Sequence, residues 1–264
     1  MRDALVAALL TAIATAVVGT WVVLRGLSFL GDALAHGVLP GVAIAFVLDV
    51  HPTWGAMLAA LTMVGTLNVL RARTPFSEDI SIGVLFVGFL ALAVVIMSSS
   101  SGSYSGDLNR FLFGSITGVT DADLVRQAAA AGVAVLGVVA MYRSLLVSTF
   151  DEDHARLSGF HPRAIHGGLV TLIAIAIVAS FETVGNLLVF SFLVAPPATA
   201  ALLVRRVPVI TLVAVGIGSA CSILGLLISY HFDTAAGATM ALVTVVVFLI
   251  AAVARPTAGP PPRR

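Results

Sequence analysis

The chain has 264 residues, of which 59% are hydrophobic and only 10% are charged, with a formal net charge of +1. This composition excludes a soluble globular domain of this size and indicates an integral membrane protein, while the nearly neutral charge gives no indication of nucleic-acid binding. The chain has no lysine, which excludes a lysine-bearing phosphate-binding loop, and its single cysteine, Cys221, cannot form an internal disulfide.

Nine segments are candidates for membrane-spanning helices, each of which needs about 20 apolar residues. They cover roughly residues 4–24, 29–48, 53–70, 80–98, 122–147, 164–182, 184–204, 208–229 and 235–254. We expect the segment at 184–204 to be short or only partly spanning, because Pro196 and Pro197 interrupt it. The sequence therefore predicts an all-α polytopic membrane protein with eight or nine transmembrane helices. We expect one transmembrane domain over residues 1–254 and a disordered, proline-rich cytoplasmic tail over 255–264.

The arginines predict the orientation of the chain. Eleven of the 14 basic residues fall near residues 25, 71–73, 143–163 and 205–206 or in the tail. Short cytoplasmic loops carry an excess of basic residues, so we place these connections inside and the N-terminus outside.

The stretch GDALAHGVLPG, from Gly31 to Gly41, places ionisable residues inside an apolar segment. Asp32 and His36 are four residues apart and share one face of a helix, which Gly37, Pro40 and Gly41 would loosen or kink. A carboxylate and an imidazole are good ligands for divalent ions such as Zn²⁺ or Mn²⁺. Ionisable residues inside a membrane usually have a function, but the two side chains could also form a hydrogen-bonded pair that fixes helix packing.

The predicted cytoplasmic loop STFDEDHARLSGFHPRA, from Ser148 to Ala164, is strongly charged. Acidic residues precede a basic one between Asp151 and Leu157, which favours a short helix, and Gly159 is placed to end it. Such a helix is either a solvated connector or a surface on which a partner docks.

Four stretches in this order resemble the permease subunit of the zinc, manganese and iron type of ABC importer. They are GDALAHGVLPG, DLNRFLFGSITGV (Asp107–Val119), DEDHARLSG, and VGNLLVFSFLVAPPATAALL, which begins at Val184. Two departures are modest: Ala35 stands where the family usually has serine, and Glu182 places an acid just before Val-Gly.

The resemblance implies a multi-pass protein of the bacterial cytoplasmic membrane that imports a divalent transition metal ion and is itself no enzyme. The implied partners are a cytoplasmic ATPase subunit, an extracytoplasmic metal-binding protein, a second copy of this chain and membrane lipid. The resemblance implies no cofactor, since the metal is cargo. Asp32 and His36 would be transient ligands of the ion path, with Glu182 as a weaker candidate. The docking helix for the ATPase would comprise Asp151, Glu152, Arg156, Leu157 and Gly159.

Two other classes of protein need comparison. A secondary metal transporter driven by an ion gradient often carries a His-x-x-x-Asp pair and a His-rich loop, but here Asp precedes His and the six histidines are scattered. A membrane-embedded hydrolase would need His-Glu-x-x-His or Gly-x-Ser-x-Gly, and neither motif occurs. Asp and His as ligands fit zinc, manganese and iron(II) alike, so the sequence leaves the metal open.

Overall fold

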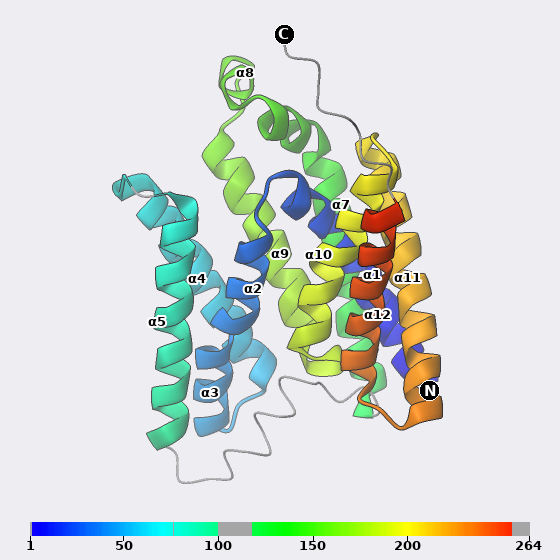
Figure 1. Ribbon diagram of the computed structural model, residues 1–264. Coiled ribbons are helices and arrows are strands. Elements are labelled where there is room, and N and C mark those ends of the chain that lie inside the picture. Colours follow the sequence, from blue (N-terminus) through cyan, green and yellow to red (C-terminus); the bar gives the residue numbers. More distant parts are fainter. Residues whose placement is uncertain (1, 76, 100–117, 255–264) are drawn as a thin grey trace.

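A computed structural model describes residues 2–75, 77–99 and 118–254, and the regular elements in these ranges are helices. Figure 1 shows them as one bundle of mostly long helices. In chain order they are α1 (Arg2–Leu24), α2 (Ser28–Gly37), α3 (Leu39–Val47), α4 (Pro52–Arg73), α5 (Glu78–Ser99), α7 (Asp121–Phe150), α8 (Glu152–Leu157), α9 (Pro162–Val184), α10 (Asn186–Leu203), α11 (Val207–Phe232) and α12 (Ala236–Ala254). The expected tail from residue 255 and most of the Asp107–Val119 stretch lie outside the described residues.

The predicted all-α polytopic fold is confirmed. Eight helical segments are long and apolar enough to cross a membrane, with α2 and α3 together forming one of them, and α10 is a shorter apolar helix. One end of the bundle holds the end of α12 and four connections, which are α1–α2, α4–α5, α7–α9 and α10–α11 (Figure 1). We call this the arginine-rich end, because these are the connections that the arginine distribution places together. Its assignment to the cytoplasm remains a prediction.

Helix α1 occupies the centre of the bundle. It is apolar on all sides and packs against α7, α9, α10 and α11. Two of its buried threonine hydroxyls form hydrogen bonds within the helix. Thr15 donates to the carbonyl of Thr11 at 2.6 Å, and Thr20 donates to that of Ala16 at 2.8 Å. Gln127 of α7 donates to the hydroxyl of Thr11, which ties the two helices together. A helix with no polar face fits such a central position, because neighbouring helices cover it on every side.

The seventh apolar segment is short, as expected, since the apolar part of α10 covers only Leu188–Leu203, but the expectation that Pro196 and Pro197 interrupt it is wrong. Helix α10 continues through both prolines to Leu203. Pro197 has no N–H, so the carbonyl of Leu193 cannot receive its usual bond within the helix. Gly19 of α1 lies directly against that carbonyl, so closely that a Cβ atom at Gly19 would overlap it. This approach places a Cα–H group beside the orphaned oxygen, and a neighbouring helix thereby helps α10 to tolerate the proline.

Helices α3 and α4 also cross at glycines. A Cβ atom added at Gly55 would overlap the carbonyl oxygen of Gly41, and one added at Gly41 would overlap that of Gly55. Small residues let helix backbones approach closely, which is a main source of helix association in membranes. This crossing holds α3, and with it the segment that contains Asp32 and His36, against α4.

Replacing Gly55 by alanine should therefore destabilise the bundle. Overpacking of this kind costs about 1–3 kcal/mol, which corresponds to a fall of roughly 3–10 °C in the temperature at which the purified protein loses its monodisperse form. The matched control is Gly65→Ala in the same helix, where an added Cβ meets no atom within 4 Å. Equal thermal stability of the two variants would contradict a packing role for the Gly41–Gly55 crossing.

Candidate functional site

Asp32 and His36 lie one turn apart on α2 and contact each other. His36 Nδ1 is 3.3 Å from Asp32 Oδ1 and 3.1 Å from the backbone carbonyl of Asp32. Each side chain is 29% exposed in the single chain, whereas Ala33, Leu34 and Ala35 between them are buried. The predicted acid–imidazole pair is thus formed, and it is partly exposed on the surface of the single chain.

Two glycines on α2 mark the faces of the helix that pack against neighbouring helices. A Cβ atom at Gly31 would overlap the side chain of Leu193 on α10, and one at Gly37 would overlap Met63 on α4. These faces of α2 are therefore closed by neighbouring helices. The rings of His36 and Phe86 on α5 meet edge to face with centroids 5.6 Å apart. No motif in the sequence connects Phe86, an isolated aromatic residue on α5, to a site on α2.

The backbone is interrupted beside this pair. Helix α2 ends at Gly37, and α3 begins at Leu39 with Pro40 in its first turn. Pro40 cannot donate to the carbonyl of His36, which would be its partner in a continuous helix. His36 also lies near the middle of the span Ser28–Val47. A helix break at this depth is tolerated where it lines a cavity or is buried in protein.

The pair supplies only two side-chain ligands. Among the described residues, no group of three or more His, Cys, Asp or Glu side chains could hold a metal ion. Glu182, the weaker candidate from the sequence, lies near the end of α9, and its side chain is outside the described part of the structure. Two ligands make a weak site, so any further ligands have to come from water, backbone oxygens or another chain.

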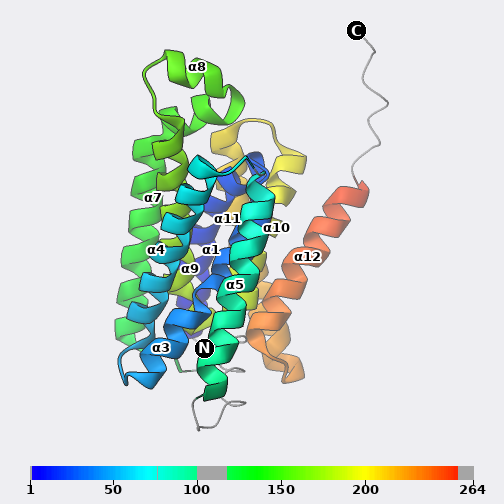
Figure 2. The same cartoon turned by 90° about the vertical axis from the view of Figure 1, so that its left-hand side faces the viewer.

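The helix predicted at the arginine-rich end is α8, which projects beyond the ends of the long helices (Figures 1 and 2). The side chain of Asp151 caps it by accepting from the backbone N–H of His154 at 2.8 Å. Arg156 pairs with Glu152 at 2.9 Å and with Asp153 at 3.3 Å. These contacts fix the charged side chains of a helix of only six residues.

Helix α8 ends as the sequence predicts. Gly159 has a φ of +81°, and its N–H donates to Arg156 O while that of Phe160 donates to Ala155 O. These two hydrogen bonds around a residue in the left-handed conformation form a Schellman motif, which favours glycine. Ala155 is buried, whereas Leu157 is 87% exposed. The helix thus has one anchored face and presents an uncovered leucine at its end.

Arg25 links the helix of the acid–imidazole pair to the helix that precedes α8. It lies in the α1–α2 connection, and its Nε and Nη2 atoms donate to Thr149 and Ser148 at 2.9 and 2.7 Å. Both acceptors are in the last turn of α7, directly before α8. The start of α2 and the base of α8 are therefore joined by charge-assisted hydrogen bonds, which are about twice as strong as neutral ones.

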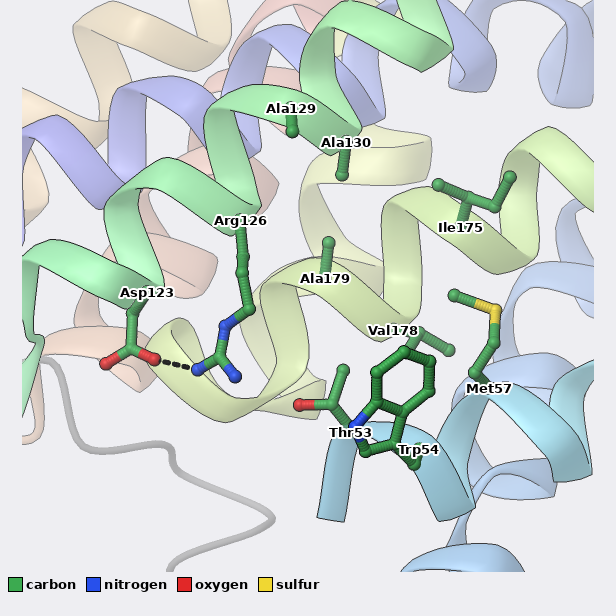
Figure 3. A pocket seen from close by; sticks show the side chains of 10 residues that line it. All are labelled: Thr53, Trp54, Met57, Asp123, Arg126, Ala129, Ala130, Ile175, Val178 and Ala179. Carbon is green, nitrogen blue, oxygen red and sulfur yellow. Dashed lines mark hydrogen bonds and ion pairs between the residues drawn. The ribbon is translucent and has the colours of Figure 1, made fainter. Parts of the chain in front are cut away.

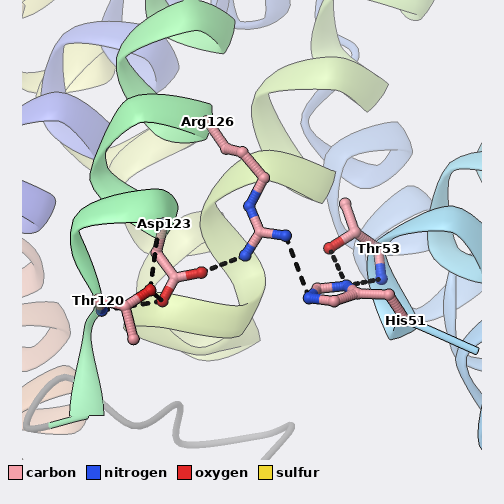
Figure 4. Close-up of polar contacts among 5 residues, drawn as sticks. All are labelled: His51, Thr53, Thr120, Asp123 and Arg126. Carbon is pink, nitrogen blue, oxygen red and sulfur yellow. Dashed lines mark hydrogen bonds and ion pairs between the residues drawn. The ribbon is translucent and has the colours of Figure 1, made fainter.

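A polar cluster lies at the end of the bundle opposite α8. Figure 4 shows Arg126 of α7 between Asp123, with which it forms an ion pair, and His51, whose Nε2 atom is 3.1 Å from Arg126 Nη1. His51 in turn caps α4 through Thr53. Asp123 and Thr120 form a capping box at the start of α7. The cluster thus connects the first turns of α4 and α7.

A mostly apolar cavity of about 310 Å³ adjoins this cluster. Figure 3 shows that its walls come from α4, α7 and α9, with Trp54 and Met57 on one side and Ala129 and Ala130 on the other. Trp54 is 75% exposed. Amphipathic aromatic residues collect at the membrane surface, so Trp54 fits the depth at which a spanning helix leaves the membrane.

The helices thus define a polytopic membrane protein with an interrupted helix and an acid–imidazole pair near the middle of one span. The chain matches the ABC 3 transport family over residues 1–255 and belongs to that family. The manganese transport system membrane protein MntC of Halalkalibacterium halodurans is 35% identical over 210 residues, which are 80% of this chain and 72% of the relative. The chelated iron transport system membrane protein YfeD of Yersinia pestis is 33% identical over 205 residues, which are 78% of this chain and 68% of the relative.

The fold agrees with a solved structure. PsaBC from Streptococcus pneumoniae, in complex with a Fab, superposes with a TM-score of 0.85 at 31% identity, covering 97% of this chain and 91% of that one. The resemblance to the permeases of metal-type ABC importers is therefore confirmed. The chain is a multi-pass protein of the bacterial cytoplasmic membrane.

Replacing Arg126 by glutamine should loosen the first turn of α4. The variant loses the ion pair with Asp123 and the contact with His51, so the cap of α4 is less restrained. We expect backbone amides in peptides covering residues 48–56 to exchange with deuterium about two- to fivefold faster, since a partly exposed contact to a charged group contributes about 0.5–1 kcal/mol. Arg2→Gln removes an arginine from the same end of the bundle and is the control. Unchanged exchange in Arg126→Gln would show that the cluster does not hold α4.

Proposed function

We propose that this chain is the transmembrane subunit of an importer that moves a divalent transition metal ion through the membrane, driven by a separate cytoplasmic ATPase. The Asp32–His36 pair carries the proposal, because it places a carboxylate and an imidazole at mid-depth on an open face. The named relatives transport manganese and iron. Oxygen and nitrogen ligands without a thiolate suit Mn²⁺ and Fe²⁺, and they also bind Zn²⁺.

A second copy of the chain would complete the ion path. Two ligands bind a metal ion weakly, whereas two facing Asp32–His36 pairs would offer four. An apolar surface near α2 supports this pairing, because a second copy would cover it. There α10 and α12 border a cavity of about 570 Å³ that is lined by Phe190, and Phe190 also lies beside Gly31 on α2. Weak, shared ligands suit transport, since the ion has to leave the site as well as enter it.

Helix α8 would receive the ATPase. The positive-inside rule places the arginine-rich end in the cytoplasm, where a soluble ATPase can reach α8. Its side-chain ion pairs and its exposed Leu157 offer charge and an apolar anchor to a cleft on the partner. The bonds from Arg25 to the end of α7 would pass a movement of α8 to the start of α2. At the opposite end, an extracytoplasmic metal-binding protein would deliver the ion.

A transporter driven by an ion gradient is the alternative, and a metal-dependent uptake assay separates the two. The family match favours the ABC type. Uptake that requires the ATPase gene and survives a protonophore supports the proposal, whereas uptake that persists without any ATPase supports the alternative.

Asp32→Asn and His36→Ala should each reduce cellular uptake of radioactive manganese or iron at least tenfold, because each removes a ligand of the ion path. Membrane insertion should be unchanged, as judged by the amount of protein in isolated membranes. The control is Thr20→Val, a change of similar size at a buried polar residue of α1 that bonds only to its own helix. Wild-type uptake by an assembled Asp32→Asn/His36→Ala double variant would refute the ion-path role.

Leu157→Asp or Glu152→Arg should weaken binding of the ATPase or uncouple ATP hydrolysis from transport. In a Cys221→Ala background, a cysteine introduced at Arg156 should cross-link to the ATPase. The control is a cysteine at Phe232, which is 72% exposed at the opposite end of the bundle. Cross-linking from position 232 and not from position 156 would contradict both the cytoplasmic placement of the arginine-rich end and the docking role of α8.

A purified transporter should contain two copies of this chain. Mass photometry of the complex with its ATPase would measure the stoichiometry directly. A complex that transports metal with a single copy would contradict the shared site.

A further inference from the structure

A basic cavity lies at the arginine-rich end, away from the Asp32–His36 pair. It has a volume of about 270 Å³ and is lined by Asn68, Arg71, Arg163, Ala164 and His166. The first two residues are near the end of α4, and the other three are in the first turns of α9. Two of the five lining residues are arginines and none is acidic. The cavity is therefore a concentration of positive charge between two spanning helices.

The position of Arg163 makes an anion favourable here. Arg163 is the second residue of α9, and the first turn of this helix has no acidic residue. The N-terminal end of a helix carries a partial positive charge, so an arginine there is unfavourable unless an anion is close. The side chain of the N-cap residue His161 makes no capping hydrogen bond to α9. The first turn of α9 therefore receives no hydrogen-bond acceptor from its N-cap side chain.

Arg71 brings a second guanidinium group from α4. A basic residue is favourable in the last turn of a helix, and this accounts for Arg71 if α4 is considered by itself. In the folded chain, however, Arg71 and Arg163 line the same cavity. Asn68 lies against Gly167 of α9, where a Cβ atom would be 3.4 Å from its Nδ2 atom, so the two helices are in contact at this level. His166 is buried behind them. The floor of the cavity is therefore fixed, while its arginines remain exposed at the rim.

We propose that this cavity binds the phosphate group of an anionic phospholipid from the adjacent leaflet. Guanidinium groups match phosphate oxygens with pairs of parallel hydrogen bonds, and basic pockets between spanning helices on the cytoplasmic side suit anionic headgroups. The candidate membrane span of α4 ends at Arg71, and that of α9 begins at Pro162. These two helix ends therefore lie at the depth of the lipid headgroups. A soluble phosphate shares the chemistry but has no acyl chains to hold it at this depth.

Such a lipid would act close to the segment that we propose for coupling. Helix α9 begins after a short connection from α8, which ends at Leu157. A phosphate bound between Arg71 and Arg163 would hold the start of α9 against the end of α4. It would thereby fix one of the two long helices that flank α8.

Photolabelling of the full-length protein tests the proposal. The protein is placed in phosphatidylcholine nanodiscs with a trace of phosphatidylglycerol that carries a photoreactive group near its headgroup. Labelled peptides should include residues 68–71 and 162–166. Unlabelled phosphatidylglycerol should compete for this labelling, and additional phosphatidylcholine should not. In Arg71→Gln/Arg163→Gln the labelling should fall about 30-fold, since each basic residue near an anionic headgroup contributes a factor of about five.

Matched variants control for charge and folding. Arg205→Gln/Arg206→Gln removes two arginines from another connection at the same end and should label like the wild type. Arg163→Gln alone, which keeps Arg71, should lose about fivefold and covers the case in which the double variant does not fold. An equal loss in the Arg205/Arg206 control would overturn the proposal, because it would indicate a general attraction to basic loops.

Competition with inorganic phosphate separates the two sources of the ligand. Millimolar phosphate should leave the lipid labelling unchanged at constant ionic strength. If phosphate abolishes the labelling and unlabelled phosphatidylglycerol does not, the cavity is a site for a soluble anion and the lipid assignment is wrong. Loss of the labelling when the purified ATPase is added would also overturn it, since the partner's own side chains would then occupy the cavity.

Discussion

A polar group inside a membrane must find its partner within the protein, and most of this structure follows from that constraint. Water is absent from the hydrocarbon region, so an unsatisfied group costs several kcal/mol. Hydroxyl groups solve the problem within their own helix, as when Thr199 donates to Ala195 O and Ser222 to Gly218 O. The carbonyl of Leu193, which Pro197 deprives of its donor, lies instead against Gly19 of α1. Asp32 and His36 differ from these groups, because they partner each other and are still partly exposed.

Close contacts between helices hold the segment that carries Asp32 and His36 in place. Gly31 and Gly37 bring α2 against side chains of α10 and α4, and Gly41 brings α3 against the backbone of α4 at Gly55. The contact between Gly41 and the backbone at Gly55 leaves no room even for a methyl group, so α3 cannot rotate there without separating from α4. On a segment that is restrained in this way, the Asp32 and His36 side chains keep a fixed direction.

The same segment is connected to the arginine-rich end through Arg25. Its hydrogen bonds to Ser148 and Thr149 join the start of α2 to the last turn of α7, and α8 follows after a single residue. Helix α8 is short but firmly terminated at both ends, by Asp151 and by Gly159. Charged hydrogen bonds thus join this short helix, through the end of α7, to the helix that carries Asp32 and His36, which gives a contiguous physical connection between the surface and the centre of the bundle.

The sequence by itself determined the class of the fold, the nine apolar segments, the broken helix near Pro40 and the short helix at 151–159. These features depend on composition and on local rules: apolar length, proline without an N–H, and glycine at a left-handed position. It could not determine that α10 passes through Pro196 and Pro197, that Phe86 lies beside His36, or that Arg71 and Arg163 line one cavity. Each of these depends on contacts between helices far apart in the chain. Such contacts are set by how side chains of different helices fit together in three dimensions, a relation that the order of residues along any one segment does not contain.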